Sequence, residues 1–121
     1  MKNSTVLPKV PQMEEMKIGI SEKRSYIRIV YNQKHRPVLK VKNFKFEVDD
    51  LSESGIRFVN SEKVKLYKNI QGVLTFLCGE SIVIKGTIVW QENSLVGLLL
   101  KHLIPSAKFL KEQQYLVLTN K

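Results

Sequence analysis

The sequence predicts a small antiparallel β-barrel that ends in one helix and follows a flexible N-terminal arm. Apolar and polar residues alternate with the period of strands in several runs between residues 37 and 100. Turn-forming residues separate these runs at short intervals, as they do in β-hairpins. The final stretch begins at Pro105 and is rich in residues that favour a helix. A closed sheet would leave few exposed strand edges, and the helix could plug one end.

The elements follow in order along the chain. Residues 1–20 contain Pro8 and Pro11 and no sustained periodicity, so we expect an arm that could dock only in part. Strands are expected over residues 37–41, 44–48, 56–59, 73–77, 82–90 and 95–100. The connections expected between them are a turn at Lys42-Asn43, where Asn tolerates the left-handed region, a polar loop over residues 49–55, a tight turn at Gly79-Glu80 and a hairpin loop over residues 91–94.

The helix is expected from Pro105 to about residue 115. The apolar residues expected to dock on the barrel are Ile104, Phe109, Leu110 and Leu116. Phe44 and Phe46 alternate with charged residues and therefore fit the inward face of a strand. On the run 82–90, one face carries Ile82, Ile84, Gly86, Ile88 and Trp90.

Length and composition indicate one globular domain, which we place at residues 21–121. The single cysteine, Cys78, excludes an internal disulfide. No apolar run has the length of a signal peptide or of a membrane span, so the expected location is the cytoplasm, without membrane insertion. The net charge is +9, and residues 21–48 hold eight basic residues against two acidic ones. Such a block is typical of an anion-binding surface or of a solvated surface on a basic protein.

Two short motifs flank this basic block. The first is R-x-x-x-R, formed by Arg24 and Arg28, and the second is D-x-S-x-x-G, formed by Asp50, Ser52 and Gly55. Arginine matches phosphate oxygens and the O6/N7 edge of guanine. A carboxylate accepts from the N1–H and N2 donors of guanine, and glycine permits positive φ and close backbone approach. Together the motifs suit a guanine nucleotide, although each alone also occurs as surface charge or as an ordinary turn.

The two motifs occur in the order found in PilZ domains, and the sequence resembles that family over about residues 21–116. Gly79, Trp90, Gly97 and the terminal helix add to the resemblance. It implies a six-stranded antiparallel barrel that binds cyclic di-GMP on its outer surface. The ligand-binding residues it implies are Arg24, Arg28, Asp50, Ser52 and Gly55, with Lys23 as a further phosphate contact. A second glycine common in the family is Ser54 here.

The resemblance implies a receptor and adaptor rather than an enzyme, with cyclic di-GMP as ligand and no cofactor. We expect the ligand to order the arm that holds Arg24 and Arg28, and the changed surface to engage a downstream protein. Motility and biofilm control are processes that the family implies. A long cation at Lys23 would favour two stacked ligand molecules, because it lowers their mutual repulsion. Arg57 lies near the motif and is expected to be an outward strand residue that could line the site.

Other functions have less support. His35, Cys78 and His102 show no metal-ligand spacing, and no catalytic signature occurs. Asp49 and Asp50 are not expected to act as a pair, because adjacent strand residues point to opposite sides. The main alternative is a small barrel that binds nucleic acid through the basic block and through Tyr26, Tyr31, Phe44 and Phe46. A PilZ-type protein-interaction module that no longer binds the nucleotide is the third reading.

Overall fold

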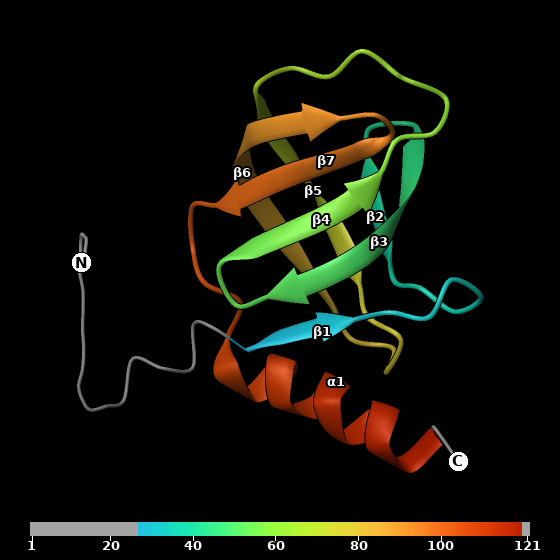
Figure 1. Ribbon diagram of the computed structural model, residues 1–121. Coiled ribbons are helices and arrows are strands. Elements are labelled where there is room, and N and C mark those ends of the chain that lie inside the picture. The colour runs from blue at the N-terminus through green and yellow to red at the C-terminus, as the bar shows by residue number, and fades with distance from the viewer. Residues whose placement is uncertain (1–26, 120–121) are drawn as a thin grey trace, which may run out of the picture.

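A computed structural model describes residues 27–119 of the chain, and these form strands followed by one helix (Figure 1). The elements are β1 (Arg28–Val30), β2 (Val38–Val41), β3 (Phe44–Ser52), β4 (Gly55–Val59), β5 (Asn69–Thr75), β6 (Ser81–Glu92), β7 (Leu95–Leu100) and α1 (Ser106–Thr119). The expected arm and the predicted ligand residues Lys23 and Arg24 lie outside the described residues. Within residues 27–119, no helix is both long and apolar enough to cross a membrane.

Six of the strands close into an antiparallel barrel, as predicted. The strands pair in the order β3-β2-β5-β6-β7-β4, and pairing of β3 with β4 completes the ring. The additional strand β1 pairs with the last residues of β3, with Arg28 opposite Ser52. Figure 1 shows β1 and α1 together at one end of the barrel, with α1 running beneath β1. The barrel therefore has one end covered by the helix and one end formed only by strand connections.

The barrel interior is filled by the apolar residues that alternate along the strands. In β5, Ile70, Gly72 and Leu74 are buried and the residues between them are exposed. Phe46 of β3 and Phe58 of β4 meet inside, with ring centroids 5.1 Å apart. The alternation therefore predicts the inward face well wherever the strand is regular.

Two expected inward residues lie outside instead. Phe44 is 44% exposed, because it stands at the very start of β3, beyond the closed part of the barrel. Trp90 is also exposed, because the register of β6 against β7 shifts between Ile88 and Trp90 and inverts the alternation there. An irregularity of this kind leaves no signature in the spacing of apolar residues.

The turns differ from the prediction in detail. Lys42, not Asn43, adopts the left-handed conformation between β2 and β3, with φ of 56°. Gly79 has φ of 98° in the β5–β6 turn, as expected for a glycine turn. The predicted loop over residues 49–55 is mostly strand, because β3 continues through Ser52 and only Glu53 and Ser54 connect it to β4.

The predicted helix is present and ends at Thr119. Ile104 and Phe109 are buried against the barrel, and Leu116 packs partly against the core. The prediction for Leu110 was wrong, since this residue is 53% exposed. Its position directly after Phe109 rotates it away from the docked face by one helical step.

Candidate functional site

An irregularity in β3 places two carboxylates on one arginine. The register of β3 against β4 shifts between Val48 and Asp50, which is a β-bulge. As a result, one Nη of Arg57 lies 2.7 Å from Asp49 Oδ2 and 2.9 Å from Asp50 Oδ2. The expectation that these adjacent carboxylates point apart was therefore wrong. The bulge adds one residue to the strand, so that both side chains reach the same outer surface.

Arg28 joins this cluster from β1. Pairing of β1 with the end of β3 brings its guanidinium Nη2 to 2.7 Å from Asp50 Oδ1. The Arg28 side chain is 49% exposed, whereas that of Asp50 is only 5% exposed. Asp50 is thus held between two guanidinium groups, of which that of Arg28 is the more exposed to solvent. The structure brings together Arg28 and Asp50 as the two motifs predict, and adds Arg57 to them.

The cluster continues along β3 as a row of alternating charges. Asp49 also accepts from Arg36 Nη2 at 3.2 Å, and Arg36 Nη1 reaches Glu47 at 3.2 Å. The row therefore links residues of β1, β3, β4 and the β1–β2 connection on the outside of the barrel. Such a network holds the side chains in defined positions before any ligand arrives.

Ser52 and Gly55 lie next to this cluster, where Ser52 is buried and Gly55 is half-buried. Ser52 is 1% exposed, and its hydroxyl lies 3.5 Å from the carbonyl oxygen of Gly55, a long contact. A Cβ on Gly55 would stand 3.2 Å from the carbonyl oxygen of Leu98. The described glycine with positive φ is Gly79, so close packing against β7, and not positive φ, accounts for Gly55.

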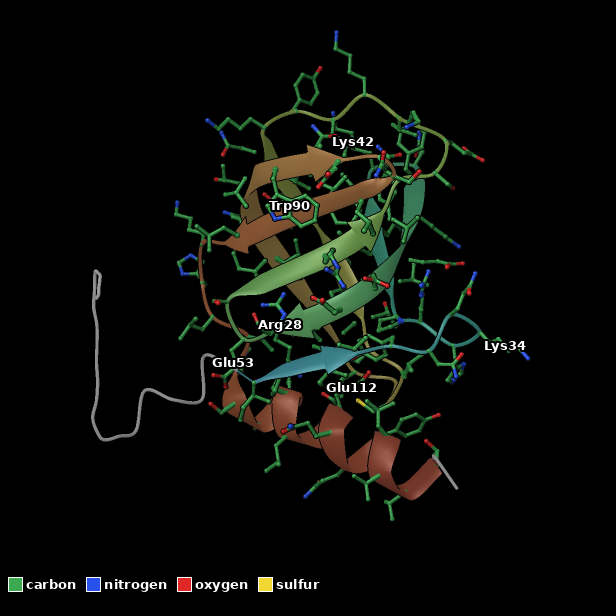
Figure 2. The ribbon with its side chains drawn as sticks, viewed as in Figure 1. Arg28, Lys34, Lys42, Glu53, Trp90 and Glu112 are labelled. Carbon is green, nitrogen blue, oxygen red and sulfur yellow. The ribbon has the colours of Figure 1, made fainter. Side chains whose placement is uncertain are left out.

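An exposed indole lies on the same outer surface. In the strand registers Asp50 stands opposite Arg57, Arg57 opposite Gly97, and Gly97 opposite Trp90. A Cβ on Gly97 would overlap the Trp90 indole, so glycine is what lets the ring lie across β7. Figure 2 shows Trp90 and Arg28 on the same side of the barrel. The resemblance pointed to Trp90 and Gly97 without assigning them to the site, and only the strand registers reveal this row.

A second buried carboxylate lies where α1 meets the barrel. Glu112 is 0% exposed and accepts from the Tyr31 hydroxyl at 2.7 Å and from the amides of Leu77 and Cys78 at 3.2 and 3.0 Å. Burial, together with the hydrogen bond to Glu112, raises the pKa of Tyr31 far above its ordinary value. Burial also raises the pKa of Cys78. Sequence reasoning missed Glu112, although its spacing from Phe109 and Leu116 places it on the docked stripe of the helix.

The candidate site is linked to α1 at two points. Tyr31 directly follows β1, so the Tyr31–Glu112 hydrogen bond anchors the strand that carries Arg28. Glu53, in the turn of the D-x-S-x-x-G motif, accepts from the Ser106 hydroxyl at the start of α1 at 3.1 Å. Figure 2 shows Glu53 and Glu112 facing different parts of the helix. Movement of β1 or of this turn would therefore strain or break one of these hydrogen bonds and so disturb the position of α1.

Comparison with known proteins identifies the family. The model of the PilZ domain family matches residues 22–113, and the chain belongs to this family. PilZ domains are binding and adaptor modules associated with cyclic di-GMP. An uncharacterized protein from Legionella of known crystal structure matches with 18% identity and a TM-score of 0.48, over 78% of this chain and 92% of that one. No curated protein matches the sequence.

Proposed function

We propose that the chain binds cyclic di-GMP on the outer surface formed by β1, β3 and β4, and signals its presence to a protein partner. The observation that carries this proposal is the Arg28–Asp50–Arg57 cluster, in which the PilZ motif residues Arg28 and Asp50 are in direct contact. The partially exposed Arg28 offers donors to a phosphate or to a guanine O6/N7 edge. Asp50 offers two acceptor oxygens to the N1–H and N2 donors of a guanine.

Binding would proceed by exchange of partners. In the free chain Arg28 donates one hydrogen bond to Asp50, and Asp50 also contacts Arg57. A guanine nucleotide carries a negative phosphate that can bind the arginine and a donor edge that can bind the carboxylate. It can therefore give each side chain a new partner in place of the other. Arg57 keeps Asp50 oriented during the exchange, because its Nη contacts Asp50 independently of Arg28. The exposed Trp90 is available to stack on a base.

The remaining residues of the site follow from the family pattern. Arg24 would supply the second guanidinium and Lys23 a further phosphate contact, while Ser52 and Gly55 shape the backbone beneath the guanine. Because Arg28 is already held in β1, the ligand would draw Arg24 and the residues before it onto the barrel and so change the surface that the partner meets. Hydrogen exchange of residues 1–36 tests this step, and identical exchange with and without the nucleotide would contradict it.

The direct test is isothermal titration with cyclic di-GMP. We expect saturable binding at micromolar concentration or below, lost in Arg28→Ala and in Asp50→Ala. Lys85→Ala, an exposed lysine on β6, is the matched control and should bind like the wild type. The titration also gives the stoichiometry, and one ligand per chain would reject stacked ligand molecules at Lys23.

Quenching of the single tryptophan, Trp90, gives an independent readout of the same site. Binding that is absent in a folded wild-type protein would contradict the proposal. It would leave a PilZ barrel that acts only through protein contacts. The nucleic-acid alternative has lost support, because Tyr31 and Phe46 are buried and cannot stack on bases.

A further inference from the structure

The end of the barrel opposite α1 carries a groove that the proposed nucleotide site does not use. It has a volume of about 390 Å³ and lies between the β2–β3 turn, the connection before β5, and the first residues of β5. The apolar side chains that line it are Val41, Phe44, Val64, Leu66, Tyr67 and Ile70. Figure 2 shows Lys42, at its edge, at the end of the barrel away from Glu112. We call this the end groove.

One wall of the end groove is a strand edge without a partner strand. β2 pairs with β5 only from Val38–Thr75 to Lys40–Val73 and turns away after Val41. Within residues 27–119, residues 69–71 of β5 therefore pair with β6 alone. Uncovered strand edges are places where an extended chain can add by backbone hydrogen bonds.

The opposite wall is fixed in place. The side chain of Asn60 accepts from the Val64 amide and donates to the Val64 carbonyl, both at 2.9 Å. The ammonium group of Lys42 lies 5.1 Å from the centre of the Tyr67 ring, which ties the connection to the β2–β3 turn. The groove is thus already formed in the free chain, so a ligand would not have to order this wall.

The rim of the end groove is positively charged and unneutralised. Lys42 and Lys65 line the groove, Lys68 lies in the chain between the lining residues Tyr67 and Asn69, and all three are exposed. Among the described residues, none of these lysines forms an ion pair, whereas Arg28, Arg36 and Arg57 all do. Glu62 is the one acidic residue in the segments 40–45 and 61–71 that bear them. A partner that fits this rim is acidic.

We propose that the end groove binds an extended acidic segment of a partner protein. The segment adds as a strand to residues 69–71 of β5, places alternate apolar side chains in the groove, and directs its carboxylates to the lysines of the rim. Half-exposed Phe44 and the 75% exposed Tyr67 supply the apolar contact area. The inference stands apart from nucleotide binding, because no residue of the groove belongs to the Arg28–Asp50–Arg57 cluster.

A peptide fits these features better than a nucleic acid or a membrane. The rim holds lysines and no arginine, one face of Tyr67 is covered by Lys42, and Phe44 stacks on Phe46 with centroids 6.3 Å apart. Each ring therefore already has a partner on one side, and the rim offers no arginine to contact base edges or to stack on bases. A lipid surface has no backbone donors and acceptors for a strand edge, and a concave site suits an inserted side chain better than a flat bilayer.

The test uses a short fluorescein-labelled peptide in which leucine and glutamate alternate, without nucleotide present. Fluorescence anisotropy should show binding to the wild type that weakens as salt is raised. The double variant Lys42→Glu/Lys65→Glu should bind roughly tenfold more weakly. Lys34→Glu is the matched control, since Lys34 is exposed in the β1–β2 connection and lies away from Lys42 in Figure 2. It should bind within about twofold of the wild type.

Backbone pairing is tested on the wild-type protein, so the outcome does not depend on folding of a variant. Two forms of the peptide carry N-methyl groups on one or the other set of alternate amides. Only one set of amides points toward β5 and donates hydrogen bonds to it. Methylation of that set should abolish binding, whereas methylation of the other set should leave it intact. Amide NMR shifts at Phe44, Ile70 and Gln71 should locate the contact.

Several results would overturn the proposal. These are no binding at about 1 mM peptide, equal binding of a leucine–lysine peptide, or equal binding of the two methylated forms. Lysine-dependent binding of single-stranded oligonucleotide or of phosphatidylserine vesicles, with none of the acidic peptide, would also reject it.

Discussion

Asp50 and Glu112 are buried carboxylates whose surroundings contrast. Asp50 is 4% exposed and is held by the guanidinium groups of Arg28 and Arg57. Glu112 is 0% exposed and is held by a hydroxyl and two backbone amides, with no cation among its hydrogen-bond donors. The two carboxylates act at opposite ends of one short segment, because Asp50 holds Arg28 at the start of β1 and Glu112 holds Tyr31 just after its end.

The different surroundings of the two carboxylates indicate which of their contacts a ligand can replace. Arg28 is half exposed, so a ligand phosphate can compete with Asp50 for it without unfolding anything. The donors to Glu112 are neutral and buried or half-buried, and Glu112 itself is fully buried, so we expect this contact to break only when α1 leaves the barrel. We therefore expect Asp50 to serve binding and Glu112 to serve stability.

The largest effect is expected for Glu112→Ala. It leaves the Tyr31 hydroxyl and the amides of Leu77 and Cys78 without an acceptor, which should cost about 3 kcal/mol of the free energy of unfolding. Urea denaturation measures this loss. Glu80→Ala is the control, because Glu80 binds Lys108 and Lys111 of the same helix from a partly exposed position, and its loss should cost much less. Equal losses of stability in the two variants would mean that Glu112 stabilises the helix no more than the ion pairs of Glu80 do.

A decline in stability is expected at high pH. The folded state holds the pKa of Tyr31 above its ordinary value of 10, because the ring is buried against Glu112. Above about pH 10 the unfolded chain loses this proton while the folded chain keeps it, so stability should fall by about 1.4 kcal/mol per pH unit. The contribution is fully present below that pH. Urea denaturation on both sides of pH 10 should show the decline in wild type and a shallower one in Tyr31→Phe.

Asp50→Asn is expected to separate binding from stability. The amide is close to isosteric but no longer attracts Arg28 and Arg57, so cyclic di-GMP binding should be lost. The free energy of unfolding should drop by only about 1 kcal/mol, because both arginines keep access to water. Titration and urea denaturation of the same sample measure the two effects. A loss as large as that in Glu112→Ala would mean that Asp50 is mainly structural.

The smallest effect is the response to salt. Added sodium chloride screens the charges around Asp50, so the stability difference between wild type and Asp50→Asn should shrink by roughly 0.5 kcal/mol or less. The difference between wild type and Glu112→Ala should stay constant, since the donors to Glu112 are neutral. Denaturation curves at low and high salt give both stability differences. If both changed equally with salt, the idea that Asp50 is held by charges and Glu112 by neutral donors would be wrong.

Much of the fold follows from local patterns in the sequence. The regular strands β2 and β5 alternate between buried and exposed residues, and the paired motifs identified the family. The short strand β1 was not predicted, because three residues carry too little periodicity and its pairing partner lies about twenty residues away. The ends of strands also shifted, since pairing across the barrel extends a strand into residues of low intrinsic preference.

The site was only partly predictable for a related reason. The motifs named Arg28 and Asp50, but the partnership of Arg57 with both aspartates depends on a bulge that no local pattern records. Trp90 joins the surface through a similar shift in β6. Glu112 was overlooked because a glutamate in a helix usually faces water, and only its position on the docked stripe signals otherwise.

The Tyr31–Glu112 hydrogen bond also orders events while the protein is being made. Its two residues are 81 positions apart, and every strand of the barrel precedes Glu112 in the chain. This hydrogen bond can therefore form only after all the strands have been synthesised, and until α1 docks the apolar surface that Phe109 covers is open to water. A variant of the chain cut just before α1 should therefore aggregate more readily than the chain with α1.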